Sequence, residues 1–119
     1  MKSEFNVIVA GSRIFNDFDL LTKKLDEIFI ERKPTSIICG EAQGADTLGR
    51  IYAKERGINV LSFPANWDKY GKVAGFVRNT EMLKHADAVI AFWDGKSKGT
   101  EHMLRIAKQA GIKVYTVIF

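Results

Sequence analysis

Three short glycine-bearing segments have the composition of phosphate-binding turns. They are Gly11-Ser12-Arg13, Gly40–Asp46 (GEAQGAD) and Gly95–Thr100 (GKSKGT), and each directly follows an apolar run of strand length. Glycine lets the backbone approach a ligand closely. A helix that begins after such a turn presents unpaired N–H groups and a partial positive charge. The three segments therefore predict a site for phosphate or carboxylate groups.

The side chains within these turns add donors and charges to the same prediction. The candidates for ligand or phosphate binding in the three turns are Gly11, Ser12, Arg13, Gly40, Glu41, Gln43, Gly44, Asp46, Gly95, Lys98, Gly99 and Thr100. Arginine can bind phosphate through two parallel hydrogen bonds, although Arg13 also fits a surface arginine beside a structural glycine. Asp46 fits either a contact to a ligand hydroxyl or an acid that stabilises the first turn of a helix. The third turn is no nucleoside-triphosphatase P-loop, because Ile90 stands where that motif needs glycine.

Four further side chains are candidates for ligand contacts outside the turns. Arg78 and Asn79 fall at or near the start of an expected helix, where they could contact phosphate or ribose, or form a solvated helix face. Trp67 and Trp93 lie on or next to the expected crevice loops and could stack on a base or a sugar, and packing explains each of them equally well. No histidine or carboxylate cluster has the spacing of a metal site, so we expect neither a metal nor a cofactor.

The elements that must position these residues alternate along the chain. Short apolar runs predict strands at Phe5–Ala10, Thr35–Cys39, Ile58–Phe63, Ala88–Trp93 and Lys113–Phe119, and helical periodicity falls between Asp17 and Pro34, between Ala45 and Gly57, over Val73–Lys84 and over Thr100–Ala110. Residues 64–72 are expected to form a loop. This alternation predicts an α/β fold, a compact Rossmann-like three-layer arrangement with a five-stranded parallel sheet and helices on both faces. Right-handed crossovers would bring the turns to one crevice at the carboxyl ends of the strands.

Size and composition limit the classes of protein to be considered. With 119 residues, of which 46% are hydrophobic and 27% charged, we expect a single globular domain over 1–119. No apolar run is long enough to span a bilayer and no signal-peptide pattern is present, so we expect a cytoplasmic protein. The net charge of +4 mildly favours anionic ligands. The one cysteine, Cys39, excludes an internal disulfide and is expected to be buried.

The motifs together resemble the YspA-like branch of the SLOG superfamily. The resemblance rests on GSR (11–13), GEAQGAD (40–46), FPANWDKYGKVAGFVRN (63–79), Met82-Leu83 and ADAVIAFWDGKSKGT (86–100). It implies a compact Rossmann-like fold, a pocket for a nucleotide or nucleotide-derived ligand, and self-association as a homo-oligomer. Relatives include the LOG phosphoribohydrolases, the DNA-processing protein A family and sensor domains for nucleotide-derived signals.

The resemblance to the LOG enzymes indicates which residues would be catalytic if this protein is an enzyme. Arg78 with Met82 resembles their catalytic arginine segment, and GKSKGT resembles their phosphate loop with Lys96 in place of a glycine. In the LOG enzymes the glutamate lies further along the chain after the threonine of the phosphate loop. In this sequence Glu101 directly follows the corresponding threonine, Thr100. One residue of displacement turns a helical side chain by about 100°. The catalytic candidates are thus Arg78 and Glu101, with Asp46 as another possible carboxylate. The displacement of Glu101 from the position of the LOG glutamate weakens the hypothesis that the protein is an enzyme.

Three functions remain open on the sequence alone. The first is binding of a nucleotide or nucleotide-derived small molecule, as a sensor or sequestering module. The second is hydrolysis of an N-glycoside or phosphoribosyl bond in nucleoside monophosphates. The third, which we rank last because no basic stripe is visible, is binding of single-stranded nucleic acid.

Overall fold

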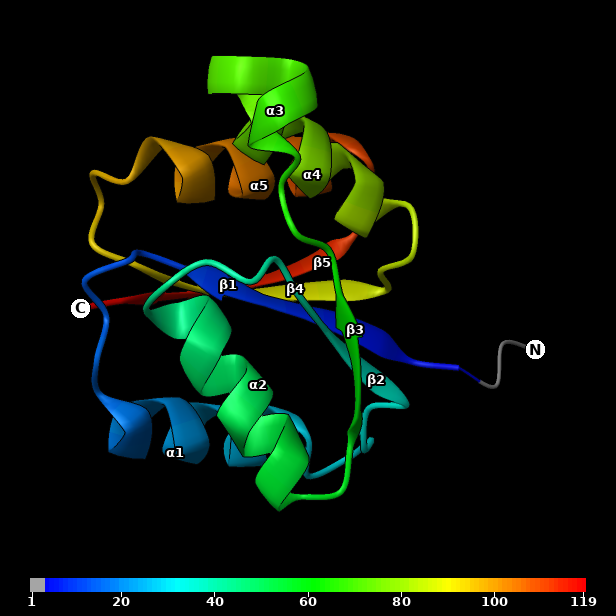
Figure 1. The fold of residues 1–119 in the computed structure, drawn as a ribbon. Helices are drawn as coiled ribbons and strands as arrows, with labels where there is room; N and C mark the ends of the chain where they lie inside the picture. The colour runs from blue at the N-terminus through cyan, green and yellow to red at the C-terminus, as the bar shows by residue number, and fades with distance from the viewer. Residues whose placement is uncertain (1–3) are drawn as a thin grey trace.

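The computed structural model describes residues 4–119, and strands alternate with helices throughout this range (Figure 1). The elements are β1 (Asn6–Gly11), α1 (Phe18–Ile28), β2 (Ser36–Cys39), α2 (Ala45–Glu55), β3 (Asn59–Ser62), α3 (Trp67–Tyr70), the 3-10 turn η1 (Gly71–Val73), α4 (Ala74–Leu83), β4 (Ala88–Trp93), α5 (Lys98–Gln109) and β5 (Lys113–Ile118). The five strands form one parallel sheet, which confirms the predicted fold class.

The strand order β3-β2-β1-β4-β5 places the first strand at the centre of the sheet. The chain builds outward from β1 to β3 on one side, then crosses over to build β4 and β5 on the other. In the register, Val7 of β1 lies between Ile37 of β2 and Ala88 of β4. Such a reversal of direction leaves a crevice outside the carboxyl ends of the two central strands. The topology therefore locates a site between the loops that follow β1 and β4.

Helices cover both faces of the sheet (Figure 1). Helices α1 and α2 lie on one face and α4 and α5 on the other, with α3 beyond α4. Val7 and Val9 belong to one apolar cluster and Ile8 and Ala10 to the other, and all four side chains are buried. Burial on both sides explains why β1 reads as a continuous apolar run instead of an alternating one. Within residues 4–119, no helix has the length and apolarity needed to cross a membrane.

Two helical segments differ from the sequence prediction. The segment predicted as a loop contains α3, which begins where the Asn66 side chain accepts a hydrogen bond from the Lys69 N–H at 3.1 Å. A helix of four residues is too short to produce a periodic apolar pattern. Helix α5 begins at Lys98, two residues before the predicted start, after Ser97 as its N-cap. Gly99 and Thr100 consequently lie within the first helical turn.

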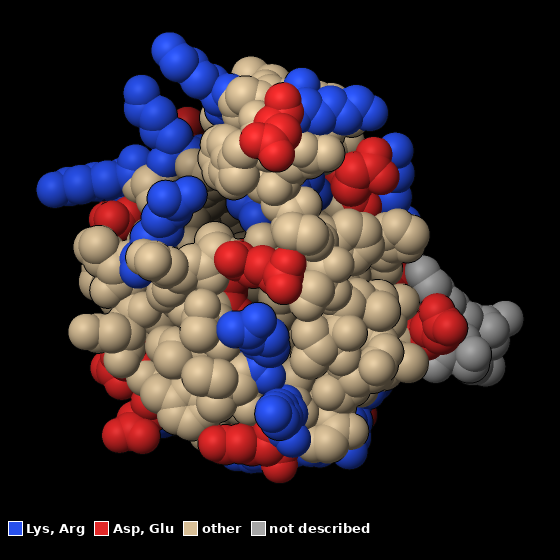
Figure 2. Space-filling model, in the orientation of Figure 1, with Lys and Arg blue, Asp and Glu red and all other residues tan. Residues whose placement is uncertain are grey.

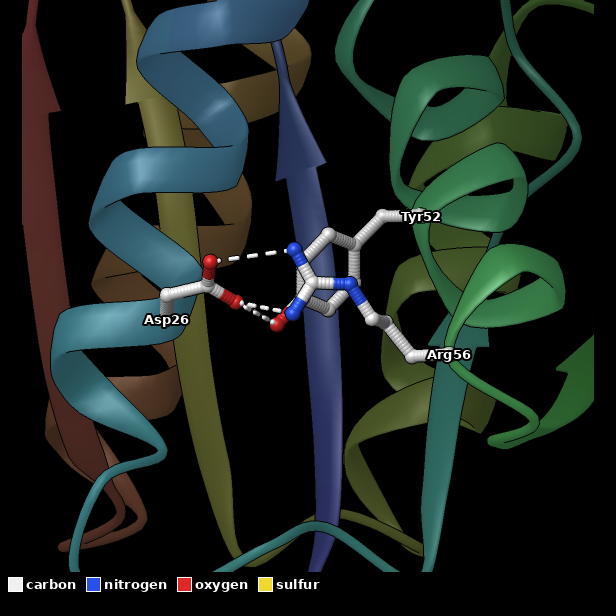
Figure 3. A network of polar contacts seen from close by, with 3 residues as sticks. All are labelled: Asp26, Tyr52 and Arg56. Atoms are coloured by element: carbon white, nitrogen blue, oxygen red, sulfur yellow. Dashed lines mark hydrogen bonds and ion pairs between the residues drawn. The ribbon is translucent and has the colours of Figure 1, made fainter.

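A polar network joins α1 to α2 on the face opposite α4 and α5 (Figure 3). The Tyr52 hydroxyl donates to Asp26 Oδ1 at 2.6 Å, and Arg56 donates to both oxygens of the same carboxylate at 2.7 and 3.0 Å. The hydrogen bond from Tyr52 and those from Arg56 lower the pKa of Asp26. The Arg56 guanidinium also lies 4.8 Å from the centre of the Tyr52 ring. This cluster fixes the two helices that position the loops after β1 and β2.

Candidate functional site

The loops after β1, β2 and β4 meet the segment around α3 and α4 at two adjoining cavities. The first, of about 420 Å³, lies between the loops after β1 and β4 and the start of α5, and we call it the α5 cavity. The second, of about 500 Å³, lies against the loop after β2, and we call it the β2 cavity. Both are within the size range of small-molecule sites. Arg13, Ala42, Trp67 and Arg78 line both cavities.

The structure brings most of the candidate residues to these two cavities. The α5 cavity is lined by the candidates Gly11, Ser12, Arg13, Asp46, Trp67, Arg78, Asn79, Gly99 and Thr100. The β2 cavity adds Gly40, Glu41 and Gln43. These residues come from four separate stretches of the chain, and their proximity is a consequence of the parallel sheet.

Five candidates lie outside both cavities: Gly44, Trp93, Gly95, Lys98 and Glu101. Glu101 is exposed in the first turn of α5, so the displacement noted in the sequence also separates it from the crevice. The Trp93 indole N–H donates to the Ser97 carbonyl at 3.1 Å and holds the loop before α5. Gly44 is the N-cap of α2 with φ of +75°, and a Cβ there would collide with the carbonyl oxygen of Ser12. Its role in this structure is to let two loops pack.

Ser12 ties the loop after β1 to the loop after β4. Its N–H donates to the Phe92 carbonyl at 2.9 Å, and its buried hydroxyl oxygen accepts from the Asp94 N–H at 3.2 Å. Asp94 in turn accepts the N–H groups of Lys96 and Ser97, both at 2.9 Å, and these bonds lower its pKa. The loop between β4 and α5 is therefore shaped by its own carboxylate, and the start of α5 has no side-chain cap.

The turn after β2 is organised around the buried carboxylate of Asp46. Oδ2 of Asp46 accepts the N–H groups of Gly40 at 3.1 Å and Ala42 at 3.4 Å. Glu41, between them, has φ of +59°, an uncommon conformation for a residue with a side chain. Two backbone amides of this turn, which was predicted to bind a ligand, are thus occupied by the protein's own carboxylate. Burial raises the pKa of Asp46 to about 6, against the opposing effects of Arg78 and these hydrogen bonds.

Arg78 reaches from α4 to the same turn. Its Nη1 donates to the Gly40 carbonyl and its Nε donates to Asn79 Oδ1 at 3.2 Å. A guanidinium has five N–H donors, so three remain for a ligand. Arg13, exposed on the loop after β1, forms no hydrogen bond or ion pair with the rest of residues 4–119, and Arg78 has no carboxylate within ion-pair distance in that range. Two arginines with free donors thus face one crevice.

Asn79 connects Arg78 to the start of α5. Its side chain is buried, its Nδ2 donates to the Gly99 carbonyl at 3.1 Å, and the same nitrogen lies 3.2 Å from His102 Nδ1. Burial lowers the pKa of His102, which keeps the ring neutral and able to accept. The His102 ring also stacks on Phe76, with centroids 4.4 Å apart. Asn79 is therefore committed to the protein through both ends of its amide.

Several residues of the α5 cavity were missed as site residues. Met82 and Met103, both buried, form part of its apolar floor, and Phe76 and Lys72 contribute to its rim. A sequence signal existed for Met82, because it follows Arg78 by four residues and so shares one face of a helix with it. No signal of that kind exists for Lys72, whose position depends on the short helical segment before α4.

The charge on the surface agrees with an anionic ligand. Figure 2 shows Lys and Arg side chains projecting from the upper left of the molecule, over the end at which α5 begins in Figure 1. Arg13, Lys72 and Arg78 line the α5 cavity, together with the carboxyl groups of Asp46 and Asp94. Three cationic side chains against two acidic ones give the cavity a positive balance, which favours a higher local concentration of anionic ligands.

Comparisons with known proteins bear on the family and the fold. Residues 5–70 match the model of the YspA, cpYpsA-related SLOG family. The Gene 61 protein of Mycobacterium phage D29 is 36% identical over 115 residues, which cover 91% of this chain and 92% of that protein. The X-ray structure of DNA processing protein A (DprA) from Streptococcus pneumoniae superposes with a TM-score of 0.74 at 17% identity over 95% of this chain and 50% of that chain. DprA therefore shares the fold over about half of its length. The chain belongs to the YspA, cpYpsA-related SLOG family.

Proposed function

We propose that the protein binds a nucleotide or a nucleotide-derived small molecule in the two adjoining cavities, as a sensor or sequestering module. The observation that carries the proposal is the pair of guanidiniums, Arg13 and Arg78, with free donors at a crevice beside the sheet's switch point. Arginine donors arranged in this way match phosphate oxygens. We also propose that the protein self-associates, as the family resemblance implies, and, separately, that it is cytoplasmic.

The remaining lining residues have defined roles in this proposal. Gly99 and Thr100, in the first turn of α5, supply backbone N–H groups and a hydroxyl to the phosphates. Gly11 and the Ser12 hydroxyl lie opposite them, since the N–H of Ser12 is already bonded to the Phe92 carbonyl. The apolar floor around Met82 and Met103 accepts the base or the sugar, and Trp67, whose side chain is about half exposed, closes one wall. Asn79 acts by holding Arg78 and the start of α5 in place.

One observation favours hydrolysis of an N-glycoside as a second candidate. Asp46 lines the α5 cavity near Arg78, its Oδ1 forms no hydrogen bond with residues 4–119, and its pKa of about 6 suits proton transfer near neutral pH. In this alternative Asp46, and not Glu101, is the carboxylate. Binding ranks higher because Oδ2 of Asp46 has a full structural role in the turn after β2.

The test begins with native mass spectrometry of the purified protein, followed by denaturation and identification of any released molecule. Titration calorimetry with AMP, ADP and ATP then compares the wild type with Arg13→Ala and Arg78→Ala. Loss of a charge-assisted hydrogen bond predicts a loss of affinity of about tenfold or more for each variant. Arg50→Ala is the matched control, because Arg50 is exposed on α2 and lines neither cavity.

The outcomes separate the candidate functions. Binding without change of the nucleotide supports the proposal, and release of free base that is lost in Asp46→Asn supports the hydrolase. Affinity for single-stranded DNA that falls steeply with added salt, with no affinity for any nucleotide, would instead favour nucleic-acid binding. Equal affinities of the Arg50, Arg13 and Arg78 variants would refute the assignment of the site.

A further inference from the structure

The two cavities meet at the arginines. Arg13, Arg78, Ala42 and Trp67 form the wall that both cavities share, so the guanidiniums lie near the middle of the combined crevice and not at its end. Each cavity alone has a volume in the lower part of the range for small-molecule sites. A ligand that filled only one of them would leave the other side of the two guanidiniums open to water.

The regions on either side of the shared wall differ from it in charge. The β2 cavity has no Lys or Arg of its own beyond the shared pair, and Glu41 and Gln43 line it. An anionic group in the β2 cavity would be repelled by the Glu41 carboxylate without a further cation to offset the repulsion. Hydroxyl groups, in contrast, can donate to the Glu41 carboxylate and accept from the Gln43 side-chain amide. The α5 cavity differs in having a cation of its own, Lys72, beside the carboxyl groups of Asp46 and Asp94, and Met82 and Met103 add apolar surface to it.

This distribution of charged, polar and apolar residues indicates which chemical group of the ligand each part of the crevice favours. Negative charge is favoured in the middle, an aromatic or apolar ring on the methionine floor, and a neutral hydroxyl-rich group in the β2 cavity. Ala42, a residue with a small side chain, and Trp67 line both cavities where they adjoin.

We propose that the ligand is a nucleoside diphosphate whose terminal phosphate carries a second, hydroxyl-bearing group. The nucleoside occupies the α5 cavity, the diphosphate lies at Arg13 and Arg78, and the second group occupies the β2 cavity. The inference rests on the proposed function, because it assigns the class of ligand for the same site.

The experiment compares matched pairs of probes by titration calorimetry: ADP with ADP-ribose, UDP with UDP-glucose, and GDP with GDP-mannose. Two variants block the β2 cavity from different loops, Gln43→Trp and Ala65→Trp; both residues line that cavity and not the α5 cavity. Gln43 is exposed, so its replacement leaves the fold intact even if the change at Ala65 does not. Gln109→Trp, on the exposed end of α5, is the control for added bulk.

In at least one pair, we expect the sugar-bearing probe to bind at least tenfold more tightly than its diphosphate. That advantage disappears in Gln43→Trp and Ala65→Trp. In Ala65→Trp the affinity for the plain diphosphate changes by less than about twofold, and Gln109→Trp binds both probes as the wild type does. The inference is overturned if diphosphates bind and no sugar-bearing partner binds more tightly, or if the advantage survives both blocking variants. If no mono- or diphosphate binds at all, the proposed function itself fails.

Discussion

Replacing Asp46 by asparagine tests the electrostatics of the turn after β2. The carboxylate is buried, with 5% of the residue's surface exposed, and its Oδ2 accepts two backbone N–H groups. Burial raises its pKa from 3.8 to about 6. Asparagine is nearly isosteric and its Oδ1 can accept the same two bonds, so the variant removes the charge and keeps the geometry.

The sign and size of the effect follow from the pKa. A carboxyl whose pKa is higher in the folded state binds its proton more tightly there, so the folded state loses stability as the pH rises from about 4 through about 6. A shift of about two units corresponds to about 3 kcal/mol at full titration. Between pH 4.5 and 7.5, the contribution of Asp46 to the free energy of unfolding of the wild type falls by about 2 kcal/mol. The free energy of unfolding of Asp46→Asn should therefore rise by about 2 kcal/mol relative to the wild type across that interval.

Urea denaturation at half-unit pH steps, followed by circular dichroism, measures this difference. Other carboxyls titrate in the same interval, and they cancel because wild type and variant share them. Asp19→Asn, at an exposed acid in the first turn of α1, shows what the loss of a helix-start charge does by itself. A difference between Asp46→Asn and wild type that stays constant with pH, or that falls as the pH rises, would refute the reasoning.

Three further changes have defined outcomes. Asn79→Ala leaves the hydrogen-bond partners of a buried amide unsatisfied, which should cost about 1–3 kcal/mol in urea denaturation and weaken AMP binding in calorimetry; unchanged affinity would show that the link to Arg78 is irrelevant to the site. Gly44→Ala combines a φ of +75° with a collision, so it should lower the melting temperature more than Gly111→Ala, whose φ of +74° faces open space; equal losses would mean that the collision relaxes without cost. The buried thiol of Cys39, whose pKa burial and the nearby Asp46 raise to about 12, should react with a thiol-specific disulfide reagent only after unfolding, and rapid labelling at neutral pH would contradict its burial.

The strands were the most predictable part of this protein. Ala88–Trp93 was predicted with both boundaries as observed. The strands β2 and β5 differ from prediction by one residue at one end, and β1 and β3 differ by one residue at both ends. Strands buried on both faces leave uninterrupted apolar runs between glycines and polar residues, which is a strong local signal. The start of α5 was less predictable, because Ser97 becomes an N-cap through the loop bonds of Asp94 and not through a local capping bond of its own.

The positions of the site residues were more predictable than what their side chains do. That the turns would meet follows from the parallel topology, and the structure places most of the candidate residues along the two cavities. Asp46 was expected to act through the helix start or a ligand hydroxyl, yet its carboxylate accepts amides from Gly40 and Ala42. Trp93 was a candidate for stacking, yet its N–H is committed to Ser97. These partners lie four to six residues away in the sequence, within the same turn or loop. The bonds depend on the exact backbone conformation of that turn or loop, which residue types and periodicity do not specify.

The central position of β1 has a consequence for synthesis on the ribosome. The first strand pairs with β2 early, but its other edge stays open until β4 has been made and has crossed over to it. A nascent chain that ends before α5 can therefore assemble the half-sheet β1-β2-β3 with α1 and α2, while Gly99 and Thr100, which complete the α5 cavity, have not yet been translated. The α5 cavity, in which we propose that part of the ligand binds, is therefore complete only in the last stage of translation, and a fragment that ends before β4 would leave one edge of β1 unpaired.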